Sequence, residues 1–239
     1  MTVPPANNNP RELDGIINIR KPIGWSSNDV IRWLKKRSRR IKIGHAGTLD
    51  PFADGVLLVC FGRSTKDVPR LMALEKEYIA RIRFGGETDT LDVTGRVVQT
   101  CAVPHFSAAQ LEKTRSRFLG EIEQIPPTFS AIRIKGKRAY QLARNGQTIS
   151  MKSRRVRIHE LEISSKSDTE CDLRVICSKG TYIRSLARDI AKTLGTAGYV
   201  KKLTRTRIGH YKISSSLELS DLAAQLKNSC GYESILGHR

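Results

Sequence analysis

The sequence has no long apolar run, no cysteine-pair motif and no recognisable leader. No stretch of about 18 apolar residues occurs, so we expect no membrane-spanning helix. The 5 cysteines are an odd number and none forms a C-x-x-C pair, which argues against a disulfide framework and a zinc site. Residues 1–13 are polar and proline-rich without the apolar core of a signal peptide, so we expect them to be disordered. A reducing, cytoplasmic location fits these features.

Acidic residues are scarce and unevenly placed. The chain of 239 residues has 23 acidic and 42 basic side chains, for a net charge of +19. No acid occurs from 124 to 159 or from 190 to 217. The first of these stretches holds Arg133, Lys135, Lys137, Arg138, Arg144, Lys152, Arg154, Arg155 and Arg157. The pattern predicts a surface that binds the phosphate backbone of a nucleic acid. The alternatives are a solvated charged face and a basic protein with no specific polyanion partner.

The hydrophobic periodicity predicts an α+β fold. Alternating or apolar runs predict strands at 15–19, 56–61, 78–84, 156–163 and 173–177. Capping residues and helical spacing predict helices that begin near Ser26 and Ser107, one from 181 to 194, and a last short one capped by Ser220. Long strands mixed with separated helices indicate a mixed, largely antiparallel sheet flanked by helices. The length favours one large domain with at most a small appendage.

One carboxylate, Asp50, ends a glycine-rich turn and precedes an apolar run. A carboxylate can act as a nucleophile, a general base, a metal ligand or a helix N-cap. The residues after Pro51 indicate a strand, which disfavours a cap. His45 and Asp54 do not stand at a recognised metal-ligand spacing from it. The pattern therefore favours catalysis by Asp50.

Six motifs in order resemble the TruB family of tRNA pseudouridine synthases. They cover about residues 14 to 212, nearly the whole chain. The motifs are K-P-x-G-x-x-S at 21–27, G-H-A-G-T-L-D-P at 44–51 with G-V-L at 55–57, K-E-Y at 76–78, T-x-T-x-D-x-x-G at 88–95, Q-I-P-P at 124–127 with S-A at 130–131, and C-S-K-G-T-Y-I-R at 177–184.

The resemblance implies a pseudouridine-synthase-like fold and a known reaction. A uridine in the T loop of tRNA, position 55 in standard tRNA numbering, would be isomerised to pseudouridine without a cofactor or metal. Residues 14–212 would form the catalytic domain, with a basic RNA-binding insertion at 124–157. Residues 213–239 leave room for a helix and a tail, in place of the PUA-like domain of many relatives. Monomer is the expected state, with tRNA as the partner and no membrane association.

The resemblance also assigns roles to residues. Asp50 would be the nucleophile or the carboxylate that assists glycosidic cleavage, and Arg184 would pair with it and favour its ionised form. Tyr78 would stack on the flipped base, which offsets the cost of extrusion. The remaining support would come from Tyr182 and Leu203, which shape the pocket, and from His45, which enters the T loop. RNA contacts would come from Lys21, Lys66, Arg133, Lys135 and Lys137.

Two features keep other interpretations open. The insertion reads Phe129-Ser130-Ala131-Ile132-Arg133 where the family usually has Tyr-Ser-Ala-x-Lys, and arginine differs from lysine in geometry. A basic surface alone would also suit a non-catalytic protein that binds or folds tRNA. Such a protein would not need Asp50, Tyr78 and Arg184 together. A ribosome-associated structural protein would be expected to carry lysine-rich low-complexity tails, which the sequence lacks.

Overall fold

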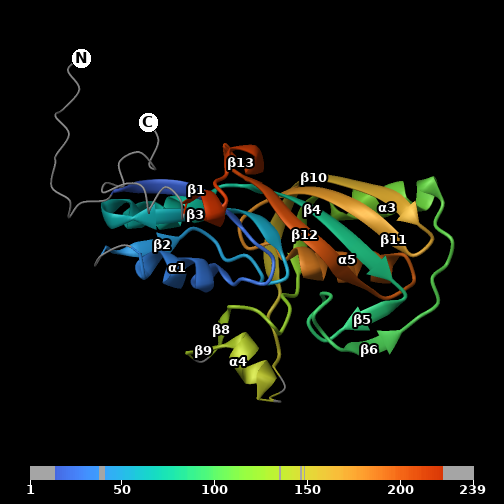
Figure 1. Ribbon diagram of the computed structural model, residues 1–239. Coiled ribbons are helices and arrows are strands. Elements are labelled where there is room, and N and C mark those ends of the chain that lie inside the picture. The colour runs from blue at the N-terminus through green and yellow to red at the C-terminus, as the bar shows by residue number, and fades with distance from the viewer. Residues whose placement is uncertain (1–13, 38–40, 135, 146, 148, 223–239) are drawn as a thin grey trace. The chain divides into compact units, whose positions relative to one another are not determined.

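A computed structural model describes residues 14–37, 41–134, 136–145, 147 and 149–222. Residues 1–13, expected to be disordered, lie outside the described residues. Strands and helices alternate irregularly along the chain (Figure 1). The strands are β1 (Gly15–Lys21), β2 (Ile43–His45), β3 (Asp54–Phe61), β4 (Lys76–Phe84), β5 (Gly86–Thr88), β6 (Val97–Thr100), β7 (Gly120–Gln124), β8 (Arg133–Ile134), β9 (Lys137–Arg138), β10 (Arg154–Ser167), β11 (Glu170–Cys177), β12 (Gly198–Ile208) and β13 (Tyr211–Lys212). The helices are α1 (Ser27–Lys35), α2 (Val68–Ala73), α3 (Ala108–Phe118), α4 (Ala139–Arg144) and α5 (Ile183–Thr193).

The described residues form two compact units, one of those up to 73 together with 207–222 and one of those from 74 to 206. In the first unit β3 pairs antiparallel with β1 and with β2. Helix α1 begins with a capping box in which Ser26 and Asp29 bond to each other's backbone amide. These hydrogen bonds to Ser26 lower the pKa of Asp29 to about 2. The apolar side of α1 packs with β1 and β3 in one core, formed by Ile17, Ile19, Val30, Ile31, Leu34, Ile43, Leu57, Val59 and Phe61, with Leu222.

The second unit is built on a sheet with the strand order β12-β4-β11-β10-β7. The pairs β4–β11, β11–β10 and β10–β7 are antiparallel. Alternate residues of β4 are buried, as their period-two pattern predicts. Helix α5 packs closely where β12 begins, because Gly198 has no Cβ. A Cβ at Gly198 would lie 2.7 Å from the Cβ of Ala191 and 3.2 Å from Ile82 of β4.

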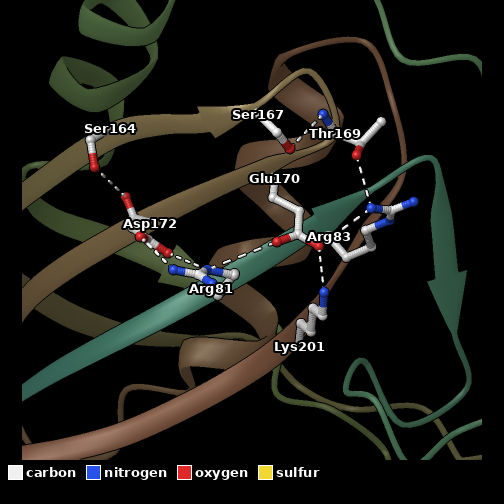
Figure 2. Close-up of polar contacts among 8 residues, drawn as sticks. All are labelled: Arg81, Arg83, Ser164, Ser167, Thr169, Glu170, Asp172 and Lys201. Carbon is white, nitrogen blue, oxygen red and sulfur yellow. Dashed lines mark hydrogen bonds and ion pairs between the residues drawn. The ribbon is translucent and has the colours of Figure 1, made fainter.

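The opposite, half-exposed face of this sheet carries a network of ion pairs (Figure 2). Arg81 of β4 donates to both carboxylate oxygens of Asp172 on β11, at 2.7 and 2.9 Å. Glu170 of β11 accepts from Lys201 of β12 at 2.6 Å and from Arg83 at 3.3 Å. These cations lower the pKa values of Glu170 and Asp172. The positive charges on this face are therefore largely neutralised by neighbouring strands.

The basic insertion leaves the sheet after β7 and returns at β10. Between them, β8 and β9 form a two-stranded hairpin followed by the short helix α4 (Figure 1). Helix α4 carries Tyr140 and Leu142.

The α+β fold with a largely antiparallel sheet is confirmed. The predicted strands and the helices α1, α3 and α5 are present, with bounds that differ by a few residues. The last helix differs, because its described part begins at Leu219, so Ser220 lies inside the helix and is not its cap. The continuation towards Leu226 lies outside the described residues.

Candidate active site

Asp50 lies in the turn between β2 and β3 of the first unit, half-buried, directly after the buried Leu49. His45 is the last residue of β2, at the other end of the glycine-rich segment. The backbone amide of Ala53 donates to the carbonyl of Asp50 at 3.1 Å, and the amide of Ala46 to the carbonyl of Leu58 at 2.9 Å. Both ends of the segment are thus bonded to the residues that follow, which limits the movement of Asp50.

The side chain of Ser27, the first residue of α1, bonds to both backbone groups of Leu49, the residue before Asp50. The Ser27 hydroxyl accepts from the amide of Leu49 at 2.9 Å and donates to the Leu49 carbonyl at 3.3 Å. The side chain is 1% exposed. A buried hydroxyl bonded in both directions fixes the peptide groups on either side of Leu49. The position of Asp50 therefore depends on α1.

Lys21 and Gly24 hold the residue after Asp50. The amide of Gly24 donates to the carbonyl of Pro51 at 2.8 Å. The ammonium of Lys21 donates to the carbonyls of Pro22 and Trp25, at 2.7 and 2.5 Å, and lies 3.5 Å from that of Pro51. Lys21 has no exposed surface. In this arrangement it stabilises the turn and is not accessible to a phosphate group.

We expect Ser27→Ala to slow catalysis more than it weakens RNA binding. The alanine leaves the buried backbone groups of Leu49 without their partner, a loss of about 1–3 kcal/mol in the free energy of unfolding. The measurements are urea unfolding and the rate of product formation at saturating RNA. Ser27→Thr, which keeps the hydroxyl, is the matched variant and should retain more activity. Equal rates for the two variants would contradict this role for the hydroxyl.

In the second unit, Tyr78 and Leu203 come from neighbouring strands of the sheet. Tyr78 lies on β4 and Leu203 on β12, and they are 9% and 6% exposed. Lys76, two residues before Tyr78, is also buried and donates to the carbonyl of Leu74 at 2.6 Å. Burial, with Arg205 and Lys179 nearby, lowers the pKa of Lys76 to about 8. Tyr78 therefore lies two residues from a buried lysine that has Arg205 and Lys179 nearby.

Arg184, in the first turn of α5, connects two loops of the second unit. Its guanidinium donates to the carbonyl of Thr90 at 2.7 Å and to that of Phe129 at 3.0 Å, and lies 3.4 Å from the carboxylate of Asp92. The side chains of Arg184 and Asp92 are only 3% and 6% exposed. The other oxygen of Asp92 accepts from Thr90 and Thr94. Sequence reasoning placed Asp92 in a motif but did not identify it as a partner of Arg184.

Tyr182 is the N-cap residue of α5, two residues before Arg184. The guanidinium of Arg154 lies 5.2 Å from the centre of its ring. Gln124 is bonded to its backbone. Gln124 begins the Q-I-P-P motif and Arg154 lies in the acid-free stretch, but the sequence assigned neither of them a contact with Tyr182.

The predicted RNA-binding residues differ in their surroundings. Lys66, Arg133 and Lys137 are exposed, and Lys135 lies outside the described residues. In the described part of the insertion, no acid lies within ion-pair distance of Arg133, Lys137, Arg155 or Arg157. The second acid-free stretch, residues 190–217, offers fewer cations to a phosphate backbone than its sequence suggests. Lys201 is bonded to Glu170, and Arg205 is only 1% exposed.

The predicted site residues divide between the two units. Lys21, His45, Asp50 and Lys66 belong to the first, and Tyr78, Arg133, Lys137, Tyr182, Arg184 and Leu203 belong to the second. The expected pairing of Asp50 with Arg184 and the stacking role of Tyr78 stay predictions.

Over the described ranges, no three His, Cys, Asp or Glu side chains group as metal ligands. No helix there is long and apolar enough to cross a membrane. Cys60, Cys101, Cys171 and Cys177 are free thiols.

Two protein-family models match the chain. The TruB family pseudouridylate synthase N-terminal domain matches residues 33–183, and the tRNA pseudouridylate synthase B C-terminal domain matches residues 184–237. The tRNA pseudouridine synthase B of Francisella tularensis subsp. tularensis (strain WY96-3418) is 46% identical over 211 residues, 88% of this chain and 70% of the relative. That of Caldanaerobacter subterraneus subsp. tengcongensis is 44% identical over 88% of this chain and 74% of the relative.

Solved structures with the same fold include a Cbf5–Nop10–Gar1 complex, with a TM-score of 0.68 and 29% identity over 90% of this chain. An H/ACA RNP bound to a substrate RNA containing 2'-deoxyuridine gives a TM-score of 0.64 and 28% identity over 88% of this chain. The chain spans 56% and 52% of the lengths of these two chains, or about half. The fold and motifs are those of the pseudouridylate synthases. Within that class, the chain belongs to the TruB family.

Proposed function

We propose that this protein isomerises a uridine in the T loop of tRNA, at position 55, to pseudouridine. The bond from N1 of the base to C1′ of the ribose breaks, and a bond from C5 of the same base to C1′ forms. The proton on C5 leaves and N1 gains one, so atoms and electrons balance without an external group. The observation that carries the proposal is a carboxylate, Asp50, on a turn held by Ser27 and Lys21 in a chain of the TruB family.

Each site residue has a proposed role that follows from its chemistry. Asp50, when ionised, attacks the sugar or assists the departure of the base. Tyr78 stacks on the flipped base and is the candidate to handle the C5 proton. The resemblance assigns Arg184 as the partner of Asp50, while Tyr182 and Leu203 complete the walls of the pocket and His45 enters the space that the base has left. The aromatic ring of Tyr78, which is 9% exposed, would supply the stacking surface for an extruded base.

We propose that the insertion at 124–157 binds the tRNA backbone. Its exposed cations Arg133 and Lys137 have no acid at ion-pair distance among the described residues, whereas those on the half-exposed face of the sheet are paired with Glu170 and Asp172. The free energy gained when bound RNA releases its counterions is therefore larger at the insertion than at the half-exposed face of the sheet. We place this activity in the cytoplasm, where free thiols stay reduced.

Replacing Arg133 and Lys137 with glutamine is expected to weaken tRNA binding and to lower its salt dependence. The slope of log K against log salt should fall by about 1 for each phosphate that the variant no longer neutralises. Binding is measured by filter retention between low and moderate salt. Lys166→Gln with Lys201→Gln is the matched control, because it removes two charges from the face that carries the ion-pair network. Equal slopes for the two double variants would contradict an RNA-binding insertion.

The proposed function is tested with an unmodified tRNA transcript carrying tritium at C5 of uridine. The protein is purified from a host whose own enzyme of this activity has been deleted. We expect release of one tritium per tRNA and a new pseudouridine in the T loop. A tRNA variant with cytidine at that position should release none. Binding of tRNA without tritium release would indicate the non-catalytic tRNA-binding protein instead.

A further inference from the structure

Gln124, the last residue of β7, is fully buried and bonded to the backbone of Tyr182, 58 residues away. Its side-chain amide donates to the carbonyl of Tyr182 at 3.1 Å. The amide of Tyr182 donates to the Gln124 side-chain oxygen at 2.8 Å. A buried glutamine that uses both ends of its amide on one residue fixes that residue's backbone in position and in orientation.

Helix α5 depends on this contact for its first residues. Tyr182 is its N-cap but provides no side-chain cap hydrogen bond. Its carbonyl already accepts the first helical bond, from Leu186 at 3.0 Å. Gln124 therefore satisfies the Tyr182 amide, which the helix leaves unbonded. The directions of the Tyr182 ring and, two residues later, of the Arg184 guanidinium follow from the backbone that Gln124 holds.

The segment after Gln124 adds further bonds to the same end of α5. The carbonyl of Ile125 accepts from the hydroxyl of Ser185 at 2.8 Å and from Arg188 at 3.3 Å. The carbonyl of Phe129 accepts from Arg184 at 3.0 Å. The start of the insertion is thus attached to the first two turns of α5.

The returning end of the insertion reaches the same place. Arg154 of β10 is paired with Gln124 across the β7–β10 ladder, and its guanidinium lies over the Tyr182 ring. Ser178, just before the Tyr182 segment, exchanges hydrogen bonds with the backbone of Arg157 at 2.8 and 2.9 Å. Both ends of the insertion are therefore bonded to residues 178–188. Gln124 lies where the two ends meet.

We propose that Gln124 is a positioning residue for catalysis, and the proposal rests on the proposed function. It holds Tyr182 and Arg184 in a fixed relation to the two strands that carry the insertion. An RNA bound by the insertion then meets a pocket wall and a guanidinium that are already in place. Such preorganisation acts on the rate of the chemical step, because small misplacements of reacting groups are costly there. The affinity for RNA depends instead on the exposed cations.

The test compares Gln124→Met, which has a similar volume and no amide, with the wild-type protein. The rate of a single turnover at saturating tRNA is expected to fall by about tenfold or more, as loss of buried hydrogen bonds implies. The dissociation constant for tRNA should stay within about twofold of wild type. Gln124→Glu, which keeps an oxygen for the Tyr182 amide but loses the donor, is the second variant. This variant should also show a lower single-turnover rate with an almost unchanged dissociation constant for tRNA.

Thr196→Val is the matched control. The Thr196 hydroxyl, 5% exposed, donates to the carbonyl of Ala102 at 2.8 Å, elsewhere in the second unit. This variant should lower the melting temperature without changing the rate of turnover. A larger rate loss in the Gln124 variants than in Thr196→Val at equal melting temperature supports positioning.

Two results would overturn the inference alone: normal turnover in both Gln124 variants, or a rate loss in Thr196→Val as large as theirs at the same melting temperature. No pseudouridine from the wild-type protein would instead overturn the proposed function, and this inference with it.

Discussion

The Asp50→Asn protein is expected to bind tRNA as the wild type does and to form no detectable pseudouridine. An uncharged amide of the same shape neither attacks the sugar as a carboxylate does nor stabilises positive charge that develops there. Removal of a group on which the chemical step depends costs about 10⁴-fold or more in rate. The turn itself should persist, because Ser27, Lys21 and Gly24 bond to the backbone of the residues on either side of Asp50. Tritium release and filter binding measure the two effects.

Asp54→Asn is the matched control for Asp50→Asn. Asp54 lies four residues later, at the start of β3, and pairs with Arg20 at 3.1 Å. Its partly exposed ion pair is worth about 1 kcal/mol or less, so turnover should stay close to wild type. Activity that persists in Asp50→Asn would show that the catalytic carboxylate is another residue. Loss of tRNA binding in the same variant would show that Asp50 supports the RNA-binding surface.

Local signals in the sequence were enough to predict the regular elements near the site. Ser26 with Asp29, and Ser107 with Gln110, are capping boxes readable from spacing, and both occur at helix starts. The alternation in β4 identified which of its side chains face the core. These signals are local because the hydrogen bonds and faces that they describe lie within a few residues along the chain.

The partners of charged residues could not be predicted in the same way. Lys201 lies in an acid-free stretch, yet it is neutralised by Glu170 from the strand on the other side of β4. Lys21 lies in a motif expected to contact RNA, yet its ammonium is buried on backbone carbonyls. Sequence spacing carries no information on which strands become neighbours, so net charge along the chain overstated the available positive surface.

The buried side chains of Ser27 and Gln124 act in the same way, and neither contact could be predicted from the sequence. Ser27 bonds to both backbone groups of Leu49, and Gln124 bonds to both backbone groups of Tyr182. Each acts on the backbone of a segment that carries a candidate functional side chain. A side chain that reacts or touches RNA is left available when its position is set through the backbone. The partners are 22 and 58 residues apart, beyond any local pattern.

Arg184→Met is expected to destabilise the protein strongly, as well as to reduce activity. The side chain is almost fully buried with the carboxylate of Asp92 and bonds to two backbone carbonyls. Removing one partner of a buried ion pair leaves the other charge uncompensated, at a cost of about 3–5 kcal/mol in the free energy of unfolding. Urea unfolding followed by circular dichroism measures this loss. Arg184→Lys should lose less stability, but an ammonium cannot reproduce the planar set of donors that connects Thr90 with Phe129.

The control for this prediction is Arg174→Met, the same substitution on β11, on the half-exposed face of the sheet of the second unit. Arg174 pairs with Glu77, Glu160 and Glu162, and all four side chains have water access. Exposed ion pairs contribute about 1 kcal/mol or less, so this variant should remain close to wild type in stability and in turnover. Equal losses at Arg184 and Arg174 would contradict the argument from burial. A stable Arg184→Lys protein with greatly reduced turnover would further indicate that the guanidinium acts in the reaction as well as in the fold, since charge alone is kept in that variant.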